Sequence, residues 1–212
     1  MQRYEIINYL IEKNKFKSYL EIGTQLDNCL KEINCRFKVG VDPDGEHHKP
    51  YNSDQFYRMT SDNYFIKNKF ELGQSFDIIF IDGLHEKVQI LRDIESALLI
   101  LNEGGFILVH DCNPLTYEAQ LSVSYVDGKL TIPHVATWNG DVWKSWVKLR
   151  YLRSDLEMYC IETDQGCGLI RKGKQETIKL DVHIDSINFN QLNVHRKIWL
   201  NLMSVEKFLK MF

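Results

Sequence analysis

The fold is decided by residues 76–114, which read FDIIFIDGLHEKVQILRDIESALLILNEGGFILVHDCNP. The nearly continuous apolar run over 76–81 is typical of a strand buried on both faces of a parallel sheet. Residues 86–101 then place apolar side chains at helical spacing, and Gly104 with its neighbouring glycine is expected to end that helix. A second apolar run follows at 106–109. The stretch predicts a strand–helix–strand unit with a right-handed crossover.

Ionisable side chains follow both strands of this unit. Asp82 and His85 come after the first strand, and His110 and Asp111 come after the second. In open parallel sheets, ligands bind in the crevice at the carboxyl ends of the strands. We therefore expect these four side chains on the rim of a functional site.

The rest of the chain continues the alternation of strand and helix. Further strands are predicted at 18–22, 37–41 and 57–60, helices at 2–14, 26–33, 63–70 and 141–153, and a hairpin at 156–161 and 168–170. This order predicts an α/β fold: a Rossmann-like, doubly wound, mostly parallel sheet with an antiparallel edge hairpin and helices on both faces. The polar stretch 45–55 is expected to be a surface loop.

The domain organisation is predicted to be simple. Residues 1–173 form the ligand-binding domain, and 115–146 is an aromatic-rich insertion that faces the substrate. Trp138 is its best pocket candidate, because flat rings stack on apolar ligand faces, whereas Trp146 fits the core stripe of its helix. Residues 174–212 are expected to be a linker followed by short docking helices.

Composition narrows the class of partner. A net charge of −3 gives no overall attraction to nucleic acid or anionic membranes, so neither is expected as a partner. No apolar stretch reaches the length of about 20 residues that crosses a bilayer, and the first residues do not read as a signal peptide. The five cysteines are odd in number and form no CxxC pair, which favours a reduced cytoplasmic setting. Cys160 and Cys167 are expected to be unpaired core thiols.

Three other strand ends describe an adenosine ligand without pyrophosphate. Glu21-Ile-Gly23-Thr24 follows the first strand, and no G-x-G-x-x-G or phosphate-loop motif is present. Asp42, after the second strand, suits the two ribose hydroxyls; its alternative is a cap on the turn into the next proline. Asp62, after the third strand, suits the adenine amino group; its alternative is a helix N-cap. Asp82 is also expected at the site, and its alternative role is that of an aspartate in an Asp-Gly turn.

These residues also resemble a known family. The segments YLEIGT, VGVD, FDIIFIDGLHEKVQILRDI and LNEGGFILVHD are similar to those of class I S-adenosylmethionine-dependent methyltransferases. The D-G-x-H and H-D motifs resemble the branch that methylates oxygen in sugars and small molecules. The resemblance implies S-adenosylmethionine as cofactor, with Glu21 and Gly23 at its methionine end and Thr24 as a further cofactor-binding candidate. It also implies Asp42 on the ribose, Asp62 near the adenine and Asp82 beside the sulfonium.

Catalysis would fall to the rim residues. His85 is the candidate general base, because an imidazole titrates near neutrality and can take a proton from a hydroxyl. Asp82 and Asp111 would orient it, and the alternative for His85 is packing in the first turn of the following helix. Asp82, His110 and Asp111 could hold Mg²⁺ or Mn²⁺, because oxygen-rich sites with an imidazole suit these ions. A turn-capping role for Asp111 is the alternative.

The sequence thus predicts an S-adenosylmethionine-dependent methyltransferase that modifies a sugar or a small hydroxylated metabolite. Two alternatives stay open: a nicotinamide (NAD) oxidoreductase on the same sheet, against which the missing glycine loop counts, and a non-catalytic partner protein that keeps the fold. The expected partner is the small-molecule acceptor. A homo-oligomer is left open.

Overall fold

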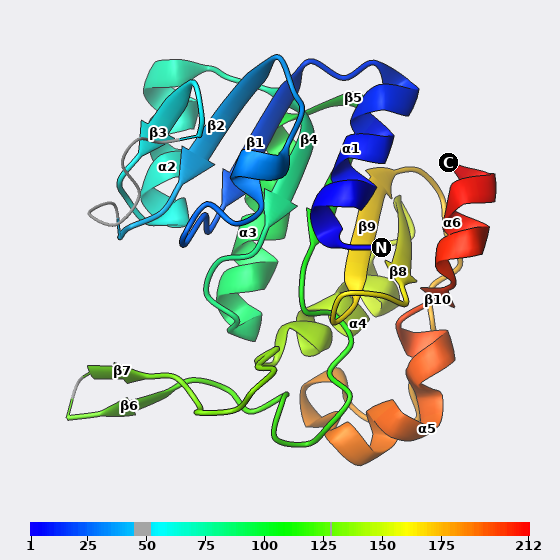
Figure 1. The fold of residues 1–212 in the computed structure, drawn as a ribbon. Coiled ribbons are helices and arrows are strands. Elements are labelled where there is room, and N and C mark those ends of the chain that lie inside the picture. The colour runs from blue at the N-terminus through cyan, green and yellow to red at the C-terminus, as the bar shows by residue number, and fades with distance from the viewer. Residues whose placement is uncertain (45–51, 128) are drawn as a thin grey trace.

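One mixed sheet organises the chain in a computed structural model that describes residues 1–44, 52–127 and 129–212. Within these residues its order is β10-β8-β9-β5-β4-β1-β2-β3 (Figure 1). The strands are β1 (Ser18–Ile22), β2 (Phe37–Val41), β3 (Gln55–Tyr57), β4 (Phe76–Ile81), β5 (Leu101–Val109), β8 (Leu156–Ile161), β9 (Cys167–Lys172) and β10 (Leu202–Met203). All neighbouring pairs are parallel except those that β9 makes with β5 and β8. The predicted fold class, including its antiparallel edge, is confirmed.

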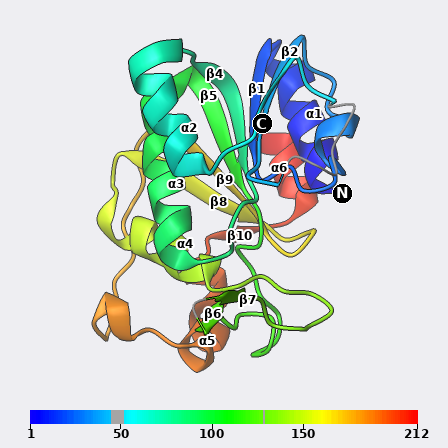
Figure 2. The ribbon, with the colours of Figure 1, turned by 90° about the vertical axis from the view of Figure 1, so that its left-hand side faces the viewer.

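Helices cover both faces of the sheet, as Figure 2 shows. They are α1 (Arg3–Asn14), α2 (Ser61–Lys67), α3 (Lys87–Ile100), α4 (Val142–Leu152), α5 (Phe189–Trp199) and α6 (Val205–Met211). One buried cluster joins α1 and α6 to one face, and a second joins α2, α3 and α4 to the other. Burial of apolar side chains on both faces explains why the central strands read as continuous apolar runs.

The central strand–helix–strand unit differs from its prediction at one end. Helix α3 ends at Ile100, and β5 begins at once with Leu101 paired to Phe76. The expectation that Gly104 ends the helix is wrong. This glycine lies in an irregular start of β5, where its φ of +75° is one that residues with a Cβ rarely adopt.

The predicted helix at 26–33 is also wrong. The chain there forms turns and a single 3-10 turn, η1 (Leu30–Glu32). Gln25 and Asp27 have φ values of +46° and +56°, which no right-handed helix can contain. The third strand is β3, two residues earlier than predicted, and most of the predicted loop at 45–55 lies outside the described residues, at 45–51.

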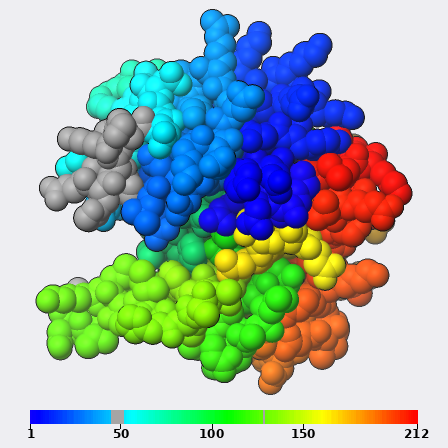
Figure 3. Space-filling model, viewed as in Figure 1, coloured from blue at the N-terminus to red at the C-terminus, as the bar shows by residue number. Residues whose placement is uncertain are grey.

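The insertion contains a hairpin that the sequence analysis missed. Strands β6 (Ser124–Val126) and β7 (Lys129–Thr131) pair with each other and stand out from the body of the molecule (Figures 1 and 3). The Asp-Gly pair at 127–128 is a typical hairpin signal that could have revealed it. Trp146 is fully buried, as expected.

The C-terminal segment adds more than docking helices. Strand β10 joins the sheet edge beside β8, with Leu202 opposite Cys160. All five cysteines are free, which confirms that Cys160 and Cys167 are unpaired core thiols. None of the described helices combines the length and the apolar character that a membrane span requires.

Candidate active site

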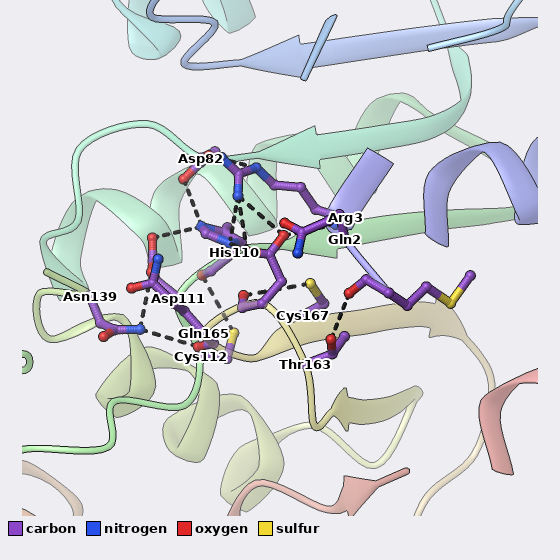
Figure 4. A network of polar contacts seen from close by, with 12 residues as sticks. Gln2, Arg3, Asp82, His110, Asp111, Cys112, Asn139, Thr163, Gln165 and Cys167 are labelled. Carbon is purple, nitrogen blue, oxygen red and sulfur yellow. Dashed lines mark hydrogen bonds and ion pairs between the residues drawn. The ribbon is translucent and has the colours of Figure 1, made fainter. Parts of the chain in front are cut away.

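Two imidazoles and two carboxylates meet where β4 and β5 end. His85 Nε2 lies 3.2 Å from both Asp82 Oδ1 and Asp111 Oδ2. His110 Nδ1 lies 3.3 Å from the same Asp82 oxygen and 2.9 Å from the same Asp111 oxygen. Nitrogen and oxygen therefore alternate around this cluster, of which Figure 4 shows three members. The structure brings together the four side chains that the two strand ends predicted.

The backbone fixes the cluster by extending the parallel ladder. Asp82 N donates to Ile22 O at 2.9 Å, and His110 N donates to Ile81 O at 3.0 Å. Asp111 then takes a φ of +62°, and its Oδ1 accepts a hydrogen bond of 3.0 Å from Asn139 Nδ2. A strained residue held by the insertion is typical of a functional site.

His85 is held at both ring nitrogens. Its Nδ1 lies 3.2 Å from Trp138 O, and its ring stacks on that of Trp138 at 4.8 Å. A carbonyl oxygen can only accept, so Nδ1 carries a proton. Burial lowers the pKa of His85, but Asp82 and Asp111 outweigh burial and raise it. Both carboxylates therefore favour a proton on Nε2 as well.

Charged groups of the cluster shift the pKa of Asp82 and of His110 so that both stay charged. Burial raises the pKa of Asp82, but the imidazoles of His110 and His85 outweigh burial and hold that pKa well below its ordinary value. Burial likewise lowers the pKa of His110, whereas Asp82 and Asp111 raise it well above the ordinary value. Asp82 is thus ionised at neutral pH, which is the state that a cation would need.

Two residues that the sequence analysis did not single out complete the cluster. Arg3 Nη1 lies 3.1 Å from Asp164 Oδ1 and 3.3 Å from His110 Nε2 (Figure 4). Arg3 Nε lies 3.8 Å from Asp82 Oδ2. Arg3 begins α1 and follows no strand. Asp164 lies in the turn after β8, which runs in the same direction as β4 and β5 because β9 is antiparallel to both β5 and β8. The position of Asp164 after a strand was a signal that the sequence analysis did not use, whereas no local sequence signal could have placed Arg3 here.

The donor set fits a divalent cation. Ligand atoms of Asp82, His85 and Asp111 all lie within 4.8 Å of one another. This group contains both predicted carboxylates but has His85 as its imidazole; His110, the predicted one, faces the same two oxygens. A metal-binding histidine usually donates its other N–H to a carbonyl or carboxylate, as His85 does to Trp138.

The end of β1 offers a narrow, polar approach. Gly23 has a φ of +84°, and a Cβ on it would lie 2.2 Å from Asp82 O, so only glycine fits. Thr24 Oγ1 is buried and has no hydrogen-bond partner among the described residues. Glu21 accepts a hydrogen bond from the Tyr19 hydroxyl, and burial raises its pKa to about 8. A cationic ligand group would find a buried acid and an unpaired hydroxyl here.

The ends of β2 and β3 carry acids that already bind their own loops. Asp42 accepts hydrogen bonds from Gln25 N at 2.9 Å and from Asp44 N at 2.8 Å. Asp62 is about half exposed and pairs with Arg92 at 3.2 Å. The N-cap of α2 is Thr60, so the alternative of Asp62 as N-cap is wrong. Each carboxylate keeps free lone pairs for a ligand.

Comparisons with known proteins give a family match over part of the chain and a shared fold. Residues 32–112 match the model of a family described as a methyltransferase domain. No curated protein matches the chain in sequence. The O-methyltransferase from Bacillus cereus in complex with SAH is 16% identical, with 79% of this chain and 78% of that chain covered and a TM-score of 0.56.

Two further solved structures are similar. The O-methyltransferase TomG from Streptomyces achromogenes, in complex with SAM, is 15% identical over 80% of this chain and 79% of that chain, with a TM-score of 0.56. The MycE methyltransferase from the mycinamycin biosynthetic pathway, in complex with Mg, SAH and mycinamycin VI, is 14% identical. It covers 78% of this chain and 48% of its own, with a TM-score of 0.50. The family match and the shared fold confirm the resemblance that the sequence motifs indicated.

Proposed function

We propose that this chain, a class I S-adenosylmethionine-dependent methyltransferase, methylates an oxygen of a sugar or similar small hydroxylated metabolite. The observation that carries the proposal is the cluster of Asp82, His85 and Asp111 beside Gly23. It places a base and two carboxylates next to the glycine at which a cofactor can approach the backbone. The sulfonium methyl is already electrophilic, so the protein has mainly to align the acceptor and take its proton.

The cofactor would lie across the ends of β1 to β4. Glu21, Gly23 and Thr24 would hold its methionine end. The buried carboxyl of Glu21 and the unpaired hydroxyl of Thr24 can form hydrogen bonds with polar groups of the cofactor. Asp42 would accept from the ribose hydroxyls and Asp62 from the adenine amino group. Asp82 would lie beside the sulfonium. The solved structures with SAH or SAM support this assignment by their shared fold.

His85 would take the proton from the acceptor hydroxyl through Nε2, so in this role a cation would be held by Asp82, His110 and Asp111 and not by His85 Nε2. For this Nε2 must be free of the proton that Asp82 and Asp111 favour there. A bound Mg²⁺ or Mn²⁺ would supply positive charge that lowers the pKa of the acceptor hydroxyl. With their charges neutralised, Asp82 and Asp111 would no longer raise the pKa of His85. Nδ1 would keep its bond to Trp138 O and so hold the ring in place.

The acceptor would lie between this cluster and the insertion at 115–146. Trp138 is half-buried, stacks on His85 and is fixed by a hydrogen bond of 2.7 Å from its Nε1 to Leu121 O. A fixed ring beside the base suits a sugar or another ligand with an apolar face. The five free cysteines support a cytoplasmic site of action.

Ligand-dependent melting tests the cofactor assignment. S-adenosylhomocysteine should raise the melting temperature, and NAD should not, because only a ligand of the native state stabilises it. A shift with NAD alone would favour the oxidoreductase and contradict our proposal.

Turnover of labelled S-adenosylmethionine with a panel of sugars and small hydroxylated acceptors tests the chemistry, with and without a chelator. His85→Ala should lower the rate by about 10²-fold or more, the range for loss of a general base. His195→Ala, whose imidazole stacks on Trp199 in α5, is the matched control. Cofactor binding with equal rates for wild type and His85→Ala would favour a non-catalytic protein or another base.

A further inference from the structure

The ionisable residues proposed above to bind the cofactor are all acidic, although the cofactor itself carries a carboxylate. These residues are Glu21, Asp42, Asp62 and Asp82. The methionine end of S-adenosylmethionine carries an ammonium group and also a carboxylate. Acids suit the ammonium group, but a ligand carboxylate among them is repelled unless a cation pairs with it. A positive group near Gly23 would pair with this ligand carboxylate.

We propose that Arg3 is this group and binds the carboxylate of the cofactor's methionine end. The inference rests on the proposed function. Arg3 lies in the first turn of α1, far in sequence from the strand ends. Its backbone is pinned to the β8–β9 turn, because Arg3 N donates to Asp164 Oδ2 at 2.8 Å and Thr163 Oγ1 donates to Met1 O at 2.6 Å. Figure 3 shows the first residues in dark blue against this turn in yellow.

The guanidinium presents an open fork. Its Nη1 makes all three of the side-chain hydrogen bonds of Arg3, to the two oxygens of Asp164 and to His110 Nε2. Nε approaches Asp82 Oδ2 only to 3.8 Å, beyond a hydrogen bond, and Nη2 has no hydrogen-bond partner in the described part of the chain. Nε–H and Nη2–H form the side-on edge of guanidinium that binds a carboxylate with two parallel hydrogen bonds.

The fork lies at the right end of the crevice. Asp82 is in contact with Gly23, since a Cβ on that glycine would meet Asp82 O at 2.2 Å. The same guanidinium is close enough to Cys29, whose pKa burial raises, to oppose that rise. Cys29 Sγ lies 3.9 Å from the hydroxyl of Tyr19, the residue that donates to Glu21. Arg3 therefore lies beside Asp82, whose backbone N donates to Ile22 O at the end of β1, and so next to the end of β1 that carries Glu21.

A purely structural role for Arg3 makes a different prediction. If Arg3 only ties α1 to the β8–β9 turn, its loss loosens the site for every ligand. If it binds the cofactor carboxylate, its loss weakens only ligands that carry that group. Three probes separate the two cases: S-adenosylhomocysteine has the carboxylate, whereas decarboxylated S-adenosylmethionine and 5′-methylthioadenosine lack it.

The test is isothermal titration of wild type, Arg3→Met and Arg3→Lys with these three probes. Arg3→Met should weaken S-adenosylhomocysteine about tenfold to a hundredfold, the range for hydrogen bonds to a charged group. It should leave the other two probes within about twofold, the scatter of near-neutral surface changes. Arg3→Lys, which keeps the charge without the fork, should show an intermediate loss for S-adenosylhomocysteine alone. Arg36→Met, an exposed arginine that precedes β2, is the matched control and should change nothing.

Any other outcome would refute either the contact between Arg3 and the cofactor carboxylate or the proposed function. Equal losses for all three probes in both Arg3 variants would show a structural tie and refute the carboxylate contact. Unchanged S-adenosylhomocysteine binding in Arg3→Met would refute it as well. Wild type that binds none of the probes would refute the proposed function itself, and Arg3 with it.

Discussion

The ends of β4 and β5 and the ends of β1 to β3 use the same residue types in different ways. At β4 and β5, Asp82 and Asp111 share two imidazoles, and one ring nitrogen of each imidazole contacts both carboxylates. At β2 and β3, Asp42 binds backbone amides of its own loop, and Asp62 pairs with a surface arginine. The position of an aspartate after a strand therefore does not by itself indicate the role of that aspartate. The number of other charged groups that face it decides whether it can hold a cation or serves a loop.

The largest effect should come from the shared cluster. Asp111→Asn removes one of the two carboxylates that face His85, so a divalent cation loses a charged ligand. We expect methyl transfer to fall by about 10²- to 10³-fold, the range for a positioned catalytic group. Mn²⁺ binding, measured by electron paramagnetic resonance, should be lost in parallel. Full activity that a chelator does not affect would contradict the assignment.

Glu21 should affect stability next. Burial raises its pKa to about 8 in the folded state, above a value of about 4.3 when unfolded. The folded state then binds the extra proton, so the free energy of unfolding falls as pH rises from about 4 to 8. Glu21→Gln should remove this loss and gain on the order of 5 kcal/mol at pH 8, or about 10–20 °C in melting temperature.

The gain in stability from Glu21→Gln should vanish near pH 4, where the Glu21 carboxyl of the wild type is largely protonated in both the folded and the unfolded state. Glu12→Gln, an exposed change on α1, is the matched control and should show no such pH dependence. A melting temperature of Glu21→Gln that runs parallel to that of wild type between pH 4 and 8 would contradict the raised pKa.

Asp42 should give a smaller, ligand-specific effect. Asp42→Asn weakens two charge-assisted bonds to backbone amides and the proposed contact to ribose. We expect about tenfold weaker binding of S-adenosylhomocysteine and a loss of about 1–2 kcal/mol of stability. Asp54 makes the same kind of bond, to Lys38 N at 2.7 Å, at the other end of β2. Asp54→Asn should therefore cost stability without changing affinity, and equal affinity losses in both variants would exclude a ribose contact.

Asp62 should show the smallest effect. Its side chain is 46% exposed, and exposed ion pairs contribute at most about 1 kcal/mol. Asp62→Asn should weaken S-adenosylhomocysteine about threefold through the lost adenine contact. Arg92→Gln breaks the same ion pair but keeps the carboxylate, so titration should show wild-type affinity. If Arg92→Gln weakened S-adenosylhomocysteine more than Asp62→Asn did, the ion pair and not the carboxylate would determine the affinity.

The pattern of residues 76–111 was sufficient for much of the candidate site. Two buried strands with a helix between them place Asp82 and Asp111 at adjacent strand ends, because parallel neighbours end at the same sheet edge. The predicted helix at 26–33 failed because Gln25 and Asp27 adopt left-handed backbone conformations. Such conformations in residues other than glycine depend on surrounding contacts, which local propensity does not contain.

The sequence by itself determined the order of strands and helices, the class of the sheet and the acids on its rim, because these follow from local periodicity. Only the tertiary structure decided that His85 faces both carboxylates, that Trp138 and Asn139 hold the cluster, and that Arg3 reaches it. Those contacts join residues far apart in the chain. They depend on how α1, the insertion and the β8–β9 turn pack around one sheet edge, and no repeat in the sequence records that packing.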